Sequence, residues 1–287
     1  MAVIAMPSSP NFVTSTFRLT RAVAVSASPF SGKTLTQEFD RVGWEAEVTL
    51  PLMRRSTAAE WQSFMLRCKG AANTFKFTDP DALTNQGTFN TTHLIGNKRA
   101  TNTNVALTVT NGNTFTAGAS TFGSLVAGDF IHVTGMASDE NNGTHKITTA
   151  TSATVVVVDS ALTNVSSTAG CKVQQNVKGA TALSLITTSS YTGTIKQGDY
   201  LGIVGSASTT ADPVQLLLVV EDAQMTDASP DKYSVRTEPK LRADLADGSY
   251  AIFTSPKGMF RMVEPAAEWS ANNVSNYSMG FSCIEVI

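Results

Sequence analysis

The sequence predicts a mainly β protein: a β-sandwich domain with one short helix, joined to two small repeated β-barrel or sandwich modules. Three observations lead to this class. Apolar and polar residues alternate along most of the chain, a single segment has helical spacing, and one short motif occurs twice. With 287 residues, of which 42% are hydrophobic, the chain is long enough for two domains or several small ones with their own cores.

The amino-terminal part shows the alternation of half-buried strands. In the stretch WEAEVTLPLM, Trp44, Ala46 and Val48 fall on one side of a strand, while Glu45 and Glu47 fall on the other. Together with the stretch TFRLTR and the turn residues between the two, this pattern predicts antiparallel hairpins. The aromatic residues that we expect in the core of this domain are Phe39, Trp44, Trp61, Phe64 and Phe281.

One segment, TAAEWQSFMLRCKG, has the spacing of an amphipathic helix instead. Thr57 and Glu60 have the spacing of a capping box, and Gly70 is placed to end the helix. The residues that form its apolar stripe are Trp61, Phe64, Met65 and Cys68. We expect this helix to pack on the sheet, and we expect a linker at residues 82–104, which are rich in Asn and Thr.

The repeated motif is a Gly-Asp pair that opens an alternating apolar segment. Gly128-Asp129 and Gly198-Asp199 lie 70 residues apart, and each pair is followed by several short strand-like segments. Glycine permits backbone angles that other residues avoid, and an aspartate carboxylate accepts backbone N–H groups, so the pair is typical of a turn. The alternative is that Asp129 and Asp199 are paired catalytic carboxylates.

The charge and the sparse reactive residues exclude several functions. A net charge of −2 without a basic patch argues against sequence-specific nucleic-acid binding. The sequence has no leader-like segment and no apolar run long enough for a membrane span, so we expect a soluble, cytoplasmically made protein. The cysteines Cys68, Cys171 and Cys283 are expected to be reduced thiols, and the histidines His93, His132 and His145 lack metal-ligand spacing.

No catalytic, cofactor-binding or metal-ligating residue emerges from the motifs. The stretch SPFSGKT at Ser28–Thr34 ends like a phosphate-binding loop, but Ala27 occupies the place of the first glycine. We therefore expect a hairpin loop with an exposed Lys33. The acidic stretch SDENNG lacks the ligand spacing of a calcium loop and is expected to be a turn. The sequence thus predicts a protein that is not an enzyme and has no cofactor.

Several separated blocks of the sequence resemble a known family. MPSSPNF, SPFSGKTLTQEF, WEAEVTLPLM, the helix with Trp61 and Phe64, and TFKFTDPD resemble the amino-terminal part of distal tail proteins of tailed bacteriophages and prophages. LRADLADGSYAIFTSPKGMFRM and YSMGFSCIEVI resemble their carboxy-terminal part. About half of the chain is covered, and the middle of the chain departs from the family. The expected domains are 1–90 with 256–287 as a β-sandwich assembly domain, 91–178 as an inserted module and 179–255 as a second module.

The resemblance implies a structural protein of the viral tail tip. Distal tail proteins form a ring, typically a hexamer, that joins the tail tube to the hub or baseplate. The expected partners are therefore further copies of the chain, the tail tube protein and the hub or baseplate protein. The expected location is the virion tail, after assembly in the cytoplasm of the bacterial host.

Two alternatives from other classes remain. A carbohydrate-binding tail or baseplate protein would stack host-surface glycans on exposed aromatic rings, and Phe115, Phe122, Phe130 and Tyr191 lie near the repeats. Most of these rings are expected in the core, because they alternate with polar neighbours. A cell-wall hydrolase is the enzymatic alternative, which the lack of a catalytic motif makes the weaker of the two.

Overall fold

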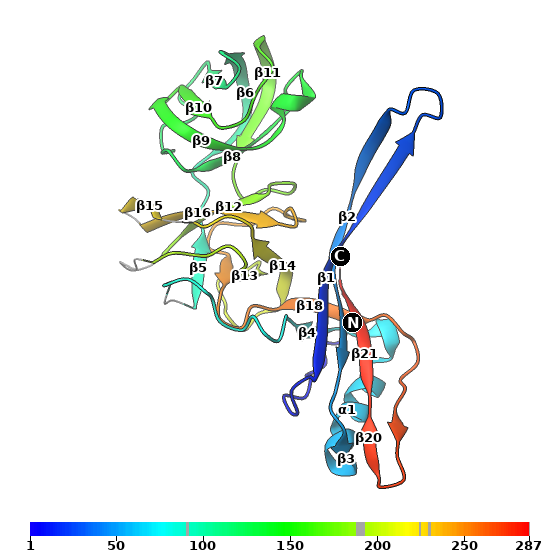
Figure 1. Cartoon of the computed structure of the whole chain (residues 1–287). Coiled ribbons are helices and arrows are strands. Elements are labelled where there is room, and N and C mark those ends of the chain that lie inside the picture. The colour runs from blue at the N-terminus through cyan, green and yellow to red at the C-terminus, as the bar shows by residue number, and fades with distance from the viewer. Residues whose placement is uncertain (90–91, 188–192, 224, 229–230, 287) are drawn as a thin grey trace. The chain divides into compact units, whose positions relative to one another are not determined.

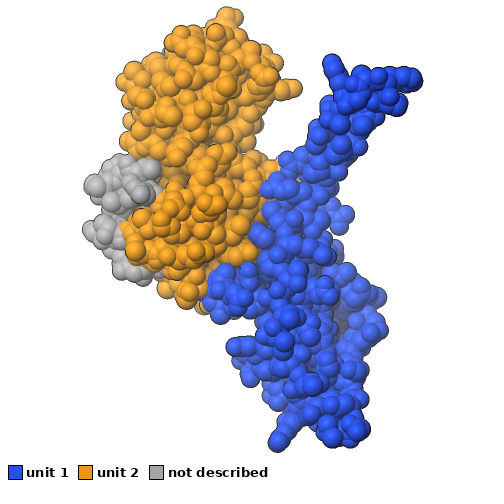
Figure 2. All heavy atoms as spheres, viewed as in Figure 1, with its two compact units in different colours: residues 1–83, 257–287 blue, residues 84–256 orange. Residues whose placement is uncertain are grey.

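The computed structural model describes residues 1–89, 92–187, 193–223, 225–228 and 231–286. The chain divides into two compact units, shown separately coloured in Figure 2. Unit 1 consists of Met1–Leu83 and Lys257–Ile287, and unit 2 consists of Thr84–Pro256. Strands dominate both units (Figure 1), so the predicted mainly β class is confirmed.

Unit 1 combines strands from both ends of the chain. Its strands are β1 (Thr14–Ala27), β2 (Thr34–Thr49), β3 (Met53–Arg54), β4 (Phe75–Phe77), β18 (Gly258–Met262), β19 (Ser270–Ala271), β20 (Asn276–Ser278) and β21 (Gly280–Glu285). The main sheet has the order β1-β2-β21-β18-β4, and a smaller one has the order β19-β20-β3. β21 pairs with β2 from Glu45↔Ile284 to Thr49↔Gly280. The last strand of the chain is therefore held by an amino-terminal strand.

The helix α1 (Arg55–Cys68) packs on this sheet through aromatic rings. Its buried residues are Ala58, Trp61, Phe64, Met65 and Cys68, which lie on one helical face. Phe64 meets Phe75 of β4 edge to face, with ring centroids 5.2 Å apart, and it also contacts Phe281 of β21 at 6.0 Å. Such pairs stabilise a core beyond the area they bury. The predicted helix and its packing on a sheet are thus present.

The ends of the helix differ in part from the prediction. α1 begins at Arg55, so Thr57 lies inside the first turn, and the N-cap residue Arg54 makes no side-chain capping hydrogen bond. The predicted capping box of Thr57 and Glu60 is wrong, because the helix begins before Thr57. At the other end Lys69 has a φ of 50°, followed by Gly70 in the 3-10 turn η1 (Gly70–Ala72). A Cβ on Gly70 would lie 2.9 Å from the Pro265 Cα, so glycine is required there.

Unit 2 contains two six-stranded antiparallel barrels with the same strand order. Barrel 1 is formed by β6 (Thr101–Thr110), β7 (Thr114–Ala117), β8 (Phe130–Thr134), β9 (Gly143–Ser152), β10 (Val155–Val158) and β11 (Val165–Gln174). Barrel 2 is formed by β5 (His93–Gly96), β12 (Ala182–Ile186), β13 (Tyr200–Val204), β14 (Pro213–Val219), β16 (Asp231–Glu238) and β17 (Tyr250–Ile252). The 3-10 turn η2 (Asp139–Asn141) precedes β9, and β15 (Met225–Ala228) pairs with β16.

The two barrels correspond strand for strand. Around barrel 1 the order is β6-β7-β10-β9-β8-β11, and around barrel 2 it is β5-β12-β16-β14-β13-β17, with β12–β16 pairing to close the ring. Numbered by their order along the chain within each barrel, both are 1-2-5-4-3-6. Barrel 1 is inserted between the first and second strands of barrel 2.

This nesting corrects the expected module boundaries. β5 lies within the expected module 91–178, yet it pairs with β12 and β17 of barrel 2. The expected linker 82–104 likewise contains β5 and the beginning of β6. Both predictions relied on local composition, whereas the pairing of β5 is with strands far along the chain. The borders of unit 1 lie at 83 and 257, where we expected 90 and 256.

Each barrel has its own hydrophobic core. Among the described residues, one buried cluster includes Leu107, Phe115 and Ile131 of barrel 1, and a separate one includes Leu94 and Tyr233 of barrel 2. A module with a separate core can in principle fold alone. The repeat detected in the sequence therefore corresponds to two separately packed barrels.

Candidate functional site

The repeated Gly-Asp motif forms the same turn in both barrels. Gly128 and Gly198 each have a φ of 93°, which glycine adopts without strain. In each copy an aspartate Oδ2 accepts a hydrogen bond from the backbone N–H three residues earlier, at 2.9 Å for Asp129 and 2.8 Å for Asp199. The glycine N–H in each copy donates to a carbonyl of the second strand after the turn, to Ile147 of β9 at 2.8 Å and to Val219 of β14 at 2.9 Å. This is the structural role that the composition of the motif predicts.

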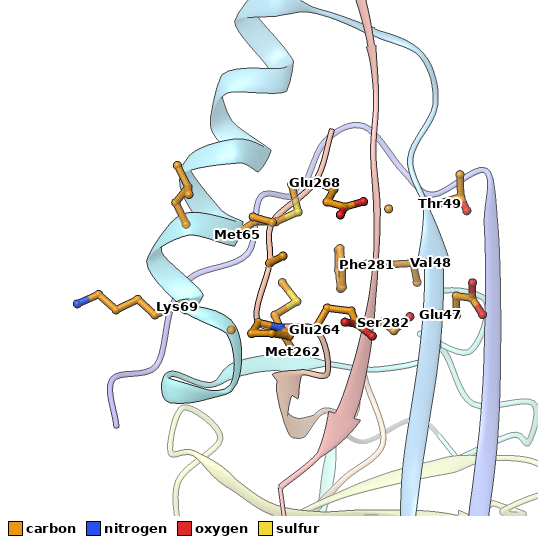
Figure 3. Close-up of a pocket in the computed structure, with 16 residues that line it drawn as sticks. Glu47, Val48, Thr49, Met65, Lys69, Met262, Glu264, Glu268, Phe281 and Ser282 are labelled. Atoms are coloured by element: carbon orange, nitrogen blue, oxygen red, sulfur yellow. The ribbon is translucent and has the colours of Figure 1, made fainter. Parts of the chain in front are cut away.

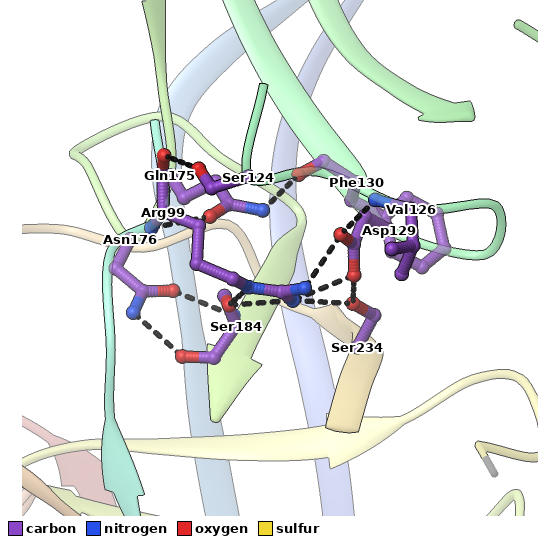
Figure 4. Close-up of polar contacts among 9 residues, drawn as sticks. All are labelled: Arg99, Ser124, Val126, Asp129, Phe130, Gln175, Asn176, Ser184 and Ser234. Carbon is purple, nitrogen blue, oxygen red and sulfur yellow. Dashed lines mark hydrogen bonds and ion pairs between the residues drawn. The ribbon is translucent and has the colours of Figure 1, made fainter. Parts of the chain in front are cut away.

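In barrel 1 the aspartate also belongs to a buried ion pair (Figure 4). Arg99 Nη1 and Nη2 donate to the two carboxylate oxygens of Asp129, each at 2.6 Å, and the side chains are 5% and 0% exposed. The Ser234 hydroxyl of β16 donates to the same carboxylate at 2.9 Å, and Arg99 donates to the Ser184 hydroxyl of β12 at 3.0 Å. The ion pair therefore links barrel 1 by hydrogen bonds to the strands β12 and β16 of barrel 2.

The same network holds the two chain segments that connect the barrels. Arg99 precedes β6 and Gln175 follows β11, and the Arg99 N–H donates to Gln175 Oε1 at 2.9 Å. Gln175 Nε2 in turn donates to the Phe130 carbonyl at 2.7 Å, and Asn176 exchanges hydrogen bonds with the backbone of Ser184 (Figure 4). Buried polar groups that are fully hydrogen-bonded fix one arrangement of the segments that carry them. We interpret this cluster as structural.

The catalytic alternative for Asp129 and Asp199 finds no support in this geometry. Asp129 is buried against Arg99, and Asp199 is 3% exposed and accepts a further hydrogen bond from the Gln86 N–H at 2.6 Å. A catalytic carboxylate has to come within hydrogen-bonding reach of its substrate. Both carboxylates are instead enclosed by the chain that they hold.

The other reactive side chains are placed for packing. Among the described residues, no group of three or more His, Cys, Asp or Glu could hold a metal ion. Cys68, Cys171 and Cys283 are buried free thiols, and burial raises the pKa of Cys68 to about 11. A thiol that stays protonated is a poor nucleophile. The acidic stretch SDENNG forms η2, which is held by backbone hydrogen bonds from Asn141 and Asn142.

The aromatic residues considered for glycan stacking are core residues where the structure describes them. Phe115 is 0% exposed, Phe122 is 1% exposed and Phe130 is 6% exposed. Tyr191 lies outside the described residues. A ring that stacks on a sugar has to expose one face, so these three phenylalanines do not form such a platform. The expectation that most of them are core is confirmed.

The expected core aromatics of unit 1 separate into two groups. Trp44, Trp61 and Phe64 are 4%, 1% and 2% exposed. Phe281 is half-buried, and its ring centroid lies within 6.5 Å of the centroids of several other aromatic rings, including that of Trp61. Phe39 is 48% exposed, so its assignment to the core was wrong. Its strand has left the sheet at that point and has no second layer to cover it.

β1 and β2 form a long hairpin that extends past the sheet (Figure 1), and Phe39 lies in β2. β1 and β2 pair along most of their length, whereas β21 pairs with β2 only from Glu45 to Thr49. We call residues 22–41 the arm. It begins at a β-bulge between Arg21 and Val23 and pairs with no other described strand. Two strands alone are marginally stable in water, and both edges of the arm are unpaired.

The arm exposes apolar side chains on both faces. Residues 23–27 and 29–39 are all exposed. Val23 (47%) and Val25 (66%) lie on one face and Leu35 (72%) lies on the other, because side chains alternate along a strand. Phe39, in the bulge, is exposed as well. At the tip Phe30 is 99% exposed. Lys33 is exposed in the same turn, as predicted from the stretch that resembles a phosphate-binding loop.

Unit 1 also has a pocket on the side of the sheet that carries α1 (Figure 3). Its volume is about 420 Å³, within the range of small-ligand pockets. Met65, Met262 and Phe281 supply apolar lining from three different elements. The residues that line it, from α1, β2, β21 and the segment after β18, include Glu47, Leu66, Lys69, Glu264 and Glu268.

Sequence reasoning missed both the arm and the pocket. In the structure β1 has 14 residues and β2 has 16, while the partner strand β21 has 6, so much of the hairpin has no third strand beside it. The run Ala22-Val23-Ala24-Val25 is apolar without alternation, which also departs from a strand with one buried face. The pocket had no such signal, because its walls come from segments far apart in the sequence.

No protein-family model matches the chain, and no curated protein matches it. Among the described residues, no helix has both the length and the apolar character needed to cross a membrane.

Proposed function

We propose that this chain is a structural component of a phage tail tip, a distal tail protein that forms a ring between the tail tube and the hub or baseplate. The observation that carries the proposal is the arm. It is a two-stranded hairpin with exposed apolar residues on both faces, attached to a unit formed by both ends of the chain. A hairpin of this kind gains stability when another surface covers it.

Ring assembly gives the arm a partner of that kind. In a closed ring each subunit uses two complementary surfaces, and one contact is repeated around the axis. An arm that reaches a neighbour is one such surface, and its free strand edges can also pair with a neighbouring strand. We propose a hexamer, because a ring whose symmetry matches a hexameric tail tube gains equivalent contacts in every subunit. DNA would pass through the ring without being read.

The sequence blocks that resemble distal tail proteins fall mainly in unit 1. They include the arm tip, β2, α1 and β21, the elements that build the sheet and the hairpin. Unit 2 contributes the two nested barrels, whose aromatic residues are largely used for their own cores. We assign ring assembly to unit 1, and we propose that the two barrels are structural modules of the same particle.

Imaging of assembled particles tests the proposal. Cryo-electron microscopy of tails, with the chain identified by a tag or an antibody, should show a ring below the last ring of the tube. Purified chain, alone or with tube or hub protein, should form a closed oligomer in analytical ultracentrifugation. Location on the capsid, absence from virions or lytic activity on cell walls would contradict the proposal.

A further inference from the structure

The tip of the arm is a defined turn that presents an aromatic ring outward. The Ser28 N–H donates to the Lys33 carbonyl at 2.9 Å, and the Gly32 N–H donates to the Ser28 carbonyl at 3.0 Å. Gly32 has a φ of 66°, which the turn requires. Phe30 lies between these anchor points and is almost completely exposed, and Lys33 is exposed beside it. The tip therefore offers one apolar ring and one cation.

The pocket of unit 1 has the complementary character. Met65, Met262 and Phe281 provide an apolar interior, and the thioether groups of methionine make favourable contacts with aromatic rings. Glu264 and Glu268 are exposed lining residues in the segment after β18, and Lys69 is the cation among the lining residues. Glu47 also lines the pocket, but it alternates with Val48 along β2, so its carboxylate lies on the opposite face of the sheet (Figure 3). The carboxylates outnumber the cation at the mouth, so a lysine next to an inserted ring would meet opposite charge.

The chain cannot bring its own tip to its own pocket. Thr34, next to the tip, and Glu47, in the pocket wall, lie thirteen residues apart on the continuous strand β2. At about 3.3 Å per residue, this separation is roughly 40 Å along the strand. An occupant from this protein therefore has to come from another copy.

We propose that Phe30 of one subunit inserts into the pocket between α1, β21 and the segment 264–268 of the next subunit, with Lys33 facing the carboxylates. The contact joins two different surfaces and is thus heterologous, which allows a ring to close. This inference rests on the proposed ring and names the contact that builds it. An apolar anchor in a pocket with a polar rim is the usual arrangement of a strong interface contact.

Thiol cross-linking tests the contact directly. Phe30→Cys combined with Leu66→Cys should give, with a short bismaleimide reagent, a ladder of covalent oligomers that ends at the closed ring. Either single substitution should give none, because the native cysteines are buried. The matched control is Phe30→Cys with Val274→Cys, since Val274 is 67% exposed and does not line the pocket. The experiment is done on concentrated protein and on assembled tails.

Association measurements give the second test. Phe30→Ala should weaken self-association by about tenfold or more, whereas Leu52→Ala, at another exposed leucine, should leave it unchanged. Lys33→Glu should weaken association, and adding Glu268→Lys should restore part of it. Because these residues are exposed, the variants should fold like the original chain.

The outcomes distinguish the inference from the proposed function. Rings that form without the specific cross-link, and that tolerate Phe30→Ala, would overturn the inference and leave the ring proposal intact. The variants Phe30→Ala and Lys33→Glu could instead lose binding to tube or hub protein while their self-association is unchanged. That result would assign the pocket to a different partner and would also overturn the inference. A chain that is absent from tail tips would contradict the proposed function itself.

Discussion

At the scale of single residues, the same Asp in two equivalent turns has acquired different environments. The described hydrogen bonds to the Asp199 carboxylate all come from backbone N–H groups. The Asp129 carboxylate also accepts hydrogen bonds from the Arg99 side chain. A buried ion pair contributes little net stability compared with apolar residues, but removing one partner leaves a buried charge without compensation. The pair therefore matters most when it is broken.

Arg99→Met should destabilise unit 2 strongly, because it leaves the carboxylate of Asp129 buried without its cation. We expect a loss of about 3–5 kcal/mol in the free energy of unfolding, measured by urea denaturation. The matched control is Lys196→Ala, which removes an exposed ion pair with Asp222 and should change stability little. Equal effects of the two substitutions would show that burial of the first pair has no energetic consequence.

His145 should make barrel 1 sensitive to acid. Burial lowers the pKa of His145, more than the Asn141 carbonyl and Asp159 raise it, and burial also lowers the pKa of the neighbouring His132. Since the folded-state pKa is below the unfolded one, the stabilisation is present above the unfolded value of about 6.5 and is lost as the pH falls through the folded value.

Thermal unfolding measured from pH 7.5 down to pH 4.5 checks this prediction. The midpoint should fall as the pH decreases below about 6.5. His145→Gln should lower stability at neutral pH and flatten the acid dependence, and His93→Gln in β5 serves as the matched substitution outside barrel 1. An unchanged slope in His145→Gln would contradict a role for this histidine.

At the scale of elements, the arm and the sheet are two parts of one pair of strands. Within the sheet, Val42 and Trp44 of β2 are buried, and β2 pairs with β21 from Glu45 to Thr49. Beyond the bulge the same strands have no second layer, and their apolar residues are exposed. The core of unit 1 thus does not depend on the arm.

Replacing residues 22–41 by Asn-Gly should therefore leave unit 1 folded. Arg21 and Val42 are directly paired, and an Asn-Gly pair closes two such residues in a tight hairpin turn. We expect the circular dichroism spectrum to remain dominated by strands and the unfolding midpoint to change little. Self-association should be abolished, as measured by ultracentrifugation. Global unfolding of the shortened chain would show that the arm is needed for the fold.

At the scale of the whole molecule, unit 2 is built by nesting rather than by succession. Barrel 1 interrupts barrel 2 between β5 and β12, and the backbones of Ala100 and Gln175 meet at the junction, with a hydrogen bond of 3.0 Å. Inserted domains whose ends lie close together are readily tolerated, because the host fold is not strained. Each barrel then keeps its own core.

Two deletions distinguish nesting from succession. Removing residues 101–174 and joining Ala100 to Gln175 should leave a soluble, β-rich chain, because all strands of barrel 2 remain. Removing residues 91–178 should yield aggregate, because it takes β5 out of barrel 2 and opens its sheet. Solubility on expression and size-exclusion chromatography compare the two. If the deletion of residues 91–178 gave a soluble product and the deletion of residues 101–174 did not, the nested arrangement would be contradicted.

Much of the local structure follows from the sequence by itself. The spacing of Trp61, Phe64 and Cys68 predicts the helix, alternation around Trp44 predicts the strand, and the Gly-Asp pairs predict the turns. These features depend on the periodicity of side chains and on the backbone freedom of glycine, which act over a few residues. The resemblance to distal tail proteins likewise required no structure.

The tertiary structure decided what these segments do together. Phe39 and Trp44 belong to one strand, yet the first is exposed and the second is buried, because coverage depends on where β21 and α1 end. The nesting of the barrels and the pairing of Arg99 with Asp129 depend on contacts between distant segments. Local composition carries no information about such contacts, since strand pairing is set by which edges meet in space. For the same reason, only the fold shows an exposed aromatic tip and a pocket that can receive it.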